Sequence, residues 1–123
     1  MMIGAHIDVI LIVTGILTAG ALPLFFAPAT ALRMMFGRAP NDDVSLAFTR
    51  HWGLIVFLVG ALLIYAAIDP PLRAPVMTVE VIEKIALGLG VFGSSLRSHP
   101  LATAIAATDS LIALVYILYF AGF

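Results

Sequence analysis

Long apolar runs separated by short polar segments divide this chain into four stretches. The first run, residues 9–32, contains no charged residue, and the later runs are also mostly apolar. A helix of about 20 apolar residues is long enough to cross the hydrocarbon core of a bilayer. The pattern therefore predicts transmembrane helices over residues 5–27, 43–68, 75–95 and 100–122.

Helix start and stop signals lie between these stretches. Pro23 and Pro28 end the first, a polar segment at residues 41–43 caps the second, and prolines open the third and the fourth. The longest connection, residues 28–41, is expected to be an interfacial segment or an amphiphilic loop. Short connections favour antiparallel neighbours, so we expect an all-α, up-down-up-down bundle of four transmembrane helices that forms one domain over residues 1–123.

The composition supports a membrane protein. Hydrophobic residues make up 63% of the chain and charged residues 11%, whereas soluble domains are about one quarter charged. The chain has no cysteine, which excludes disulfides and thiolate chemistry. The net charge is −1 and the sequence contains no basic run or patch, which argues against nucleic acid or anionic lipid as a partner.

Basic residues in the connections predict the orientation, because they are enriched on the cytoplasmic side of a membrane. Arg33, Arg38 and Arg97 lie in the first and third connections, whereas only Arg73 lies in the second. We therefore expect a multi-pass protein of a bacterial inner membrane with both termini outside the cytoplasm. Trp52, near the start of the second stretch, is expected at the membrane interface.

Three charged residues, Glu80, Glu83 and Lys84, interrupt the third stretch. On an insertion scale each charge costs roughly 2.5 to 3.5 kcal/mol, and about ten apolar residues at roughly −0.3 to −0.6 kcal/mol each cannot offset three of them. At 100° per residue the three side chains share one face, and Glu80 and Lys84 form an i,i+4 pair. We therefore expect them in the interior of the bundle, where charged groups mark a functional site.

The fourth stretch adds a carboxylate and a phenol to the same interior. Asp109 shares a stripe with small residues and with Tyr116, and small residues are typical of close helix contacts in membranes. We expect Asp109 to lie about one turn from Lys84 and Glu83. Tyr116 is expected level with Glu80, deep enough to donate a proton. The predicted arrangement is a ladder of ionisable groups along one wall.

The second stretch carries a smooth face for close helix contact, formed by Gly53, Gly60 and Ala67. Arg50 lies about 60° from this stripe and His51 lies almost opposite to it. If the stripe faces the bundle, Arg50 reaches the buried carboxylates and His51 points outward. If the stripe faces a second protomer or a partner subunit, His51 points inward.

The charges of this predicted network do not balance. Arg50 and Lys84 against three carboxylates leave a net charge of −1, which is disfavoured in a low dielectric. Either His51 or one carboxyl is then expected to carry a proton, as in a general acid–base site or a proton relay. The alternative is an ion-pair network that only fixes helix register. The candidate catalytic residues are Glu83, Glu80, Asp109 and His51, and the candidate ligand-binding residues are Arg50, Lys84 and Tyr116.

No metal or other cofactor is predicted. A dinuclear carboxylate metal site needs Glu-x-x-His motifs on two helices, whereas Glu80 and Glu83 form a Glu-x-x-Glu motif. Haem ligation by His51 would need a second histidine at the same depth, and the sequence offers none.

The positions of several residues in the first two spans resemble the pattern of a known protein family. The residues concerned are Pro28 and Leu32 at the end of the first span, then Arg50, Gly53, Gly60, Ala66 and Ala67 along the second. With four short-looped spans, this layout resembles the DoxX-like group of small bacterial membrane proteins. The resemblance implies a four-helix membrane bundle, often accessory to oxidoreductase systems, and it assigns no catalytic residue.

Three functions remain open. The leading hypothesis is a site that binds or converts a small lipophilic molecule by proton transfer, such as isomerisation or epoxide opening, and it predicts an apolar cavity that touches Glu83. The second is a non-catalytic accessory or oligomer-forming subunit of a membrane redox complex, which would use the stripe on the second stretch. The third is a proton-coupled carrier, which would need a polar path from His6 or Asp8 to Arg50.

Overall fold

The computed structural model describes residues 2–123, and every regular element in this range is helical. The prediction of an all-α fold is therefore confirmed. The elements are, in chain order, α1 (Met2–Ala5), α2 (Ile7–Ala19), α3 (Pro23–Phe26), α4 (Pro28–Phe36), α5 (Asp43–Ala66), α6 (Pro70–Phe92), the 3-10 helix η1 (Ser95–Ser98) and α7 (Pro100–Phe120).

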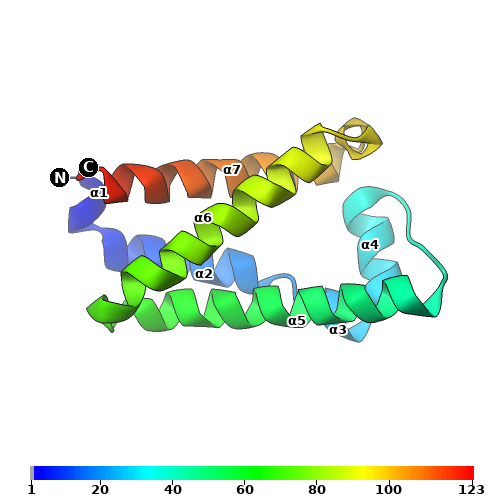
Figure 1. Ribbon diagram of the computed structural model, residues 1–123, viewed down its shortest axis with the longest axis horizontal. Coiled ribbons are helices and arrows are strands. Elements are labelled where there is room, and N and C mark those ends of the chain that lie inside the picture. The colour runs from blue at the N-terminus through cyan, green and yellow to red at the C-terminus, as the bar shows by residue number, and fades with distance from the viewer. Residues whose placement is uncertain (1) are drawn as a thin grey trace.

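The four longest helices, α2, α5, α6 and α7, lie along the length of the molecule, and consecutive ones run in opposite directions (Figure 1). α2 packs mainly against α5 and α6 mainly against α7, while α5 also contacts α6. Both termini lie at one end, where the N–H groups of Ile3 and Gly4 donate to the carbonyl oxygen of Phe123 at 3.0 and 3.2 Å. The molecule therefore consists of two helical hairpins.

By length and composition, three helical segments can cross a membrane, which supports a membrane protein. They are Ile7–Phe26, Asp43–Ala66 and Pro100–Phe120. The predicted second and fourth stretches agree with α5 and α7 at their starts and extend only slightly beyond their ends. α6 differs from the three segments because it carries four charged residues, Arg73, Glu80, Glu83 and Lys84.

α6 begins at Pro70 and not at residue 75, so the predicted start of the third stretch was too late. Proline is favoured at the first helical position, because its missing N–H has no partner there in any case. Arg73, assigned above to a connection, therefore lies in the helix. Its guanidinium donates to the carbonyl oxygens of Ala66 and Ala67 at 2.8 and 2.7 Å. These carbonyls at the end of α5 have no partner within their own helix, and Arg73 supplies it.

The first predicted stretch is broken into shorter helices. α2 ends at Ala19, and α3 and α4 each start at a proline. Part of the long connection, expected to be an interfacial segment or a loop, is the helix α4. Gly37 ends α4 with φ of +83°, a left-handed conformation that glycine adopts readily. A Cβ there would also lie 2.6 Å from Cδ2 of His99, so no other residue fits without a rearrangement.

Buried apolar side chains form two clusters at opposite ends of the bundle. One lies near the chain termini and comprises Ile7, Leu11, Leu63, Ala66, Ala67, Val76, Met77, Ile112 and Tyr116. The other lies near α4 and comprises Phe36, Val91, Ala102 and Ala106. On α6, Met77 belongs to the first cluster and Val91 to the second, so Glu80, Glu83 and Lys84 lie between the two clusters.

The small-residue stripe of α5 packs within the chain. A Cβ at Gly60 would lie 2.6 Å from the backbone nitrogen of Ala19, and one at Gly53 would lie 2.6 Å from Cβ of Leu24. The two glycines therefore allow α2 and α3 to approach α5 closely, and Ala67 is buried as well. Of the two alternatives for the stripe, the structure has the intramolecular one. A contact with another subunit would have to use a different surface.

Candidate functional site

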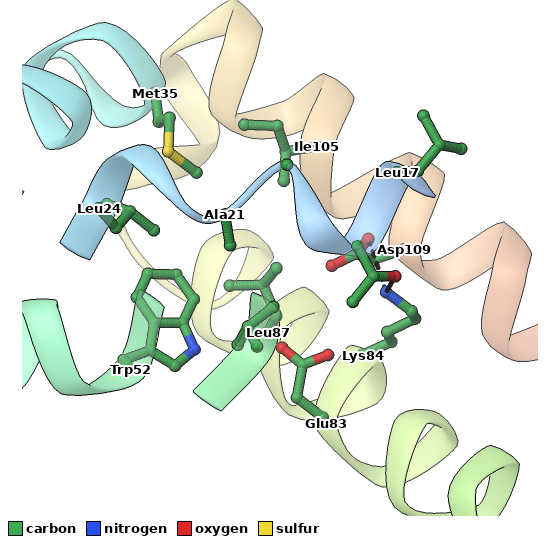
Figure 2. Close-up of a pocket in the computed structure, with 13 residues that line it drawn as sticks. Leu17, Ala21, Leu24, Met35, Trp52, Glu83, Lys84, Leu87, Ile105 and Asp109 are labelled. Atoms are coloured by element: carbon green, nitrogen blue, oxygen red, sulfur yellow. Dashed lines mark hydrogen bonds and ion pairs between the residues drawn. The ribbon is translucent and has the colours of Figure 1, made fainter. Parts of the chain in front are cut away.

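Lys84 is the centre of a buried polar cluster that joins three helices. Its Nζ lies 3.2 Å from Oε2 of Glu80 on the same helix and 3.3 Å from Oδ1 of Asp109 on α7. The same ammonium donates to Oγ1 of Thr18 on α2 at 3.0 Å. Lys84 is only 1% exposed, and Figure 2 shows its side chain reaching towards Asp109. The i,i+4 pair and the inward orientation of Asp109 agree with the sequence analysis.

Glu80 is held by charge and not by hydrogen bonds. It is 1% exposed and lies within ion-pair distance of Lys84. The geometry of that contact is not that of a hydrogen bond, and neither carboxylate oxygen has a hydrogen-bond partner among residues 2–123. Buried polar atoms without a partner are uncommon in proteins and call for an explanation.

Glu83 is the carboxylate that faces open space. Its Oε2 is buried and has no hydrogen-bond partner in the described part of the chain. The side chain lines a cavity of about 220 Å³, which Lys84 and Asp109 also line. In Figure 2 the Glu83 carboxylate points into this cavity beside Leu87. The leading hypothesis predicts such a cavity next to Glu83.

The rest of the cavity wall is mostly apolar. It is formed by Leu17, Thr18, Gly20, Ala21, Leu24, Met35, Trp52, Val56, Leu87 and Ile105. The ionisable groups thus lie at one part of a hydrophobic wall, an arrangement typical of small-molecule sites in which a few polar groups fix the orientation of the ligand.

Tyr116 does not line this cavity, so its predicted contact with a ligand stays a prediction. It is fully buried in the apolar cluster near the chain termini. Its hydroxyl is hydrogen-bonded to Oγ1 of Thr14, which itself donates to the carbonyl oxygen of Ile10 at 2.7 Å. Because a threonine hydroxyl has one hydrogen, Tyr116 is the donor in the pair with Thr14.

Arg50 and His51 also lie outside the cluster. The predicted contact of Arg50 with the buried carboxylates is wrong, since its Nη1 donates instead to the carbonyl oxygen of Phe25 at 2.9 Å. Phe25 belongs to the short helix α3, whose carbonyls lack partners within the helix and lie close to α5. His51 is exposed, as expected when the stripe faces the bundle. Without Arg50 the cluster has one ammonium and three carboxylates.

Three contributors to the buried site were not predicted from the sequence: Thr14, Thr18 and Trp52. Thr14 and Thr18 are the two hydroxyl residues of α2, where the other polar side chain is Asp8 in the first turn, and they are spaced four residues apart. Both are buried and both bond to side chains of the second hairpin. A polar residue on the buried face of a membrane helix is a usable signal for such a contact. Trp52, whose position at the membrane interface stays a prediction, lines the cavity.

The chain matches no model of a known protein family, no curated protein and no solved structure. The resemblance to the DoxX-like group therefore stays a prediction. Among residues 2–123, no group of three or more histidine, aspartate or glutamate side chains is arranged to hold a metal ion.

Proposed function

We propose that this chain is an integral membrane protein with α6 as a fourth spanning helix. Its buried site binds a small lipophilic molecule and transfers a proton from one atom of that molecule to another. The outward face of α6 supports the fourth span. Glu80 and Lys84 are buried, whereas large apolar residues face outward at Val79, Ile82, Ile85, Leu89 and Phe92. Such a surface suits lipid, because Glu80 and Lys84 are paired inside the protein and Glu83 lines the internal cavity.

The observation that carries the function is the cavity beside a carboxylate without a hydrogen-bond partner. Glu83 takes a proton from a C–H or O–H group of the bound molecule and returns a proton, the same one or one exchanged with water, to another atom of that molecule. This isomerisation needs no co-reactant, since the proton is conserved. Lys84, on the same cavity wall, stabilises negative charge that develops on a ligand oxygen. Opening of an epoxide by water is the second reaction that these groups could assist.

Asp109 and Glu80 act as positioning residues in this proposal. They hold the ammonium of Lys84 at 3.3 and 3.2 Å, so that it stays beside the cavity and away from Glu83. A net charge of −2 for one ammonium and three carboxylates is unfavourable in a buried site. Transfer of a proton from the bound molecule to Glu83 reduces this charge on the side chains until a proton is returned.

The size of the cavity limits the ligand. An apolar cavity of about 150 Å³ holds benzene, and drug-sized ligands occupy pockets of about 300 Å³ or more. At about 220 Å³, the cavity suits one ring with a few substituents, or a chain segment of similar size.

Carbon-bound hydrogen exchange tests the proposal without knowledge of the natural substrate. Small cyclic enones such as 2-cyclohexenone are incubated in D₂O with the purified protein in lipid nanodiscs, and deuterium uptake is measured by mass spectrometry. The wild type is expected to accelerate exchange, and Glu83→Gln, which keeps the shape of the side chain, is expected to slow it roughly 10²-fold or more.

Two further variants make this test specific. Asp8→Asn removes an exposed carboxylate outside the site and should leave exchange unchanged. Ala21→Leu fills the cavity and should abolish both exchange and the binding seen as a change in Trp52 fluorescence. Equal exchange by the wild type and Glu83→Gln would contradict the assignment of Glu83.

Two observations weigh against the other functions. An accessory subunit was expected to dock through Gly53, Gly60 and Ala67, and this stripe is filled by α2 and α3. A carrier was expected to connect His6 or Asp8 to Arg50, and Arg50 bonds to α3 outside the polar cluster.

A further inference from the structure

α4 and the segment before α7 lie at the same end of the bundle (Figure 1). Beyond the acid–base site, two adjoining pockets are lined by residues of this end. The first has a volume of about 320 Å³, and Arg38, Ser95, Ser98 and His99 line it. The second, of about 370 Å³, is an apolar groove bounded by Leu32, Trp52, Leu87, Gly90 and Val91. Phe36, Arg38 and Leu96 line both pockets, so the polar pocket adjoins the groove at these three side chains.

The polar pocket presents hydrogen-bond donors and a positive charge. Arg38 donates to Oγ of Ser95, a neutral partner, and forms no ion pair with an acidic residue within residues 2–123. His99 accepts from the N–H of Ala102 through Nδ1, so a neutral ring carries its hydrogen on Nε2. The hydroxyl of Ser95 is a third donor. Arginine beside neutral donors suits a phosphate group.

We propose that these two pockets bind one anionic phospholipid, with its phosphate at Arg38, Ser95 and His99 and an acyl chain in the groove that ends at Trp52. The charge of Arg38 matches an anionic headgroup, and the apolar walls match a hydrocarbon chain. In the sequence Arg38 and His99 are separated by the two long helices α5 and α6, so the sequence alone shows no basic patch. Folding of α4 against the start of α7 brings them together. This inference does not depend on acid–base chemistry at Glu83.

Trp52 is the only tryptophan of the chain and lines the groove, so its fluorescence reports on an acyl chain bound there. The protein is reconstituted in phosphatidylcholine vesicles that contain a fixed fraction of brominated lipid, and bromine quenching of Trp52 is measured. Brominated phosphatidylglycerol is expected to compete for the site about fivefold better than brominated phosphatidylcholine, the preference expected of one arginine near an anionic lipid surface.

Matched variants separate headgroup and chain. Arg38→Gln should remove the preference for phosphatidylglycerol and Arg38→Lys should keep most of it, whereas Arg33→Gln, an exposed arginine on α4, should change nothing. Gly90→Leu fills the groove, since a Cβ there meets no atom within 4 Å, and should reduce quenching by both lipids. Gly4→Leu, at an equally open glycine outside the groove, is its control.

Several outcomes would overturn the proposal. Equal quenching by the two lipids in the wild type would show that no headgroup is selected. A preference that survives Arg38→Gln, or that Arg33→Gln removes equally, would indicate general surface charge. Loss of the preference in millimolar inorganic phosphate, with quenching by phosphatidylcholine unchanged, would indicate a small-anion site and not a lipid site.

Discussion

Replacing Lys84 tests whether the buried cluster holds the two hairpins together. Lys84→Met removes the ammonium that contacts Glu80, Asp109 and Thr18, and leaves two carboxylates without a cation. Removing one partner of a buried ion pair typically costs about 3 to 5 kcal/mol, because the remaining charge stays uncompensated. With Lys84 and Glu80 each 1% exposed, solvent screens little of this cost. The free energy of unfolding should therefore fall by about 3 to 5 kcal/mol.

Unfolding by SDS in mixed micelles, followed by circular dichroism, measures this change. The triple variant Lys84→Met, Glu80→Gln, Asp109→Asn should recover most of the loss, because neutral groups often replace a buried ion pair without a large penalty. Arg33→Met, at an exposed position without such contacts, should change stability by less than about 0.5 kcal/mol. If the free energy of unfolding of Lys84→Met stays within about 1 kcal/mol of the wild type, the cluster does not hold α2 to α6. The cost of about 3 to 5 kcal/mol for breaking a buried ion pair then does not apply to this site.

Three further predictions concern the scaffold. Gly60→Ala places a Cβ against the backbone of α2 and should lower the free energy of unfolding by about 1 to 3 kcal/mol, whereas Gly90→Ala, in open space, should raise it by up to about 1 kcal/mol. Equal effects of the two variants would contradict the close packing of α2 against α5. At the start of α5, the backbone N–H of Ser45 donates to Asp42 and lowers the pKa of Asp42 below 3.8, so this cap stabilises the fold above pH 3.8 and the stabilisation is lost as pH falls through the lower folded pKa. Asp42→Ala should therefore reduce the loss of stability on acidification, and an unchanged loss would exclude the cap. Tyr116→Phe removes the donor to Thr14 and should cost about 1 kcal/mol in the same unfolding assay, with a cost near zero in the Thr14→Val background.

Helical periodicity was enough to predict the pairing of Glu80 with Lys84 and the inward direction of Asp109. The angle of 100° per residue places Glu80 and Lys84 on one face of α6, and the small residues of α7 indicate which way Asp109 points. Both relations are local, because each follows from spacing within a single helix. The structure accordingly has the three side chains in contact.

The contacts between distant segments could not be obtained in this way. Arg50 had several possible acceptors, and the carbonyl of Phe25 became the nearest only because α3 folds beside α5. The break between α2 and α3 and the helix α4 depend on how the chain turns at Pro23 and Pro28, which periodicity does not describe. Thr18 lies 66 residues from Lys84, and no pattern along the sequence links the two.

The bond between Lys84 and Thr18 has a consequence for biosynthesis. When α6 leaves the ribosome, Thr18 is already in place on α2, but Asp109 lies 25 residues further along the chain than Lys84 and emerges later. At that moment Lys84 has Glu80 as an ion-pair partner on its own helix but lacks its contact with Asp109 on α7. On the proposed four-span topology, α6 and α7 must leave the translocon as one hairpin, and a chain truncated before Asp109 should release α6 to the aqueous side.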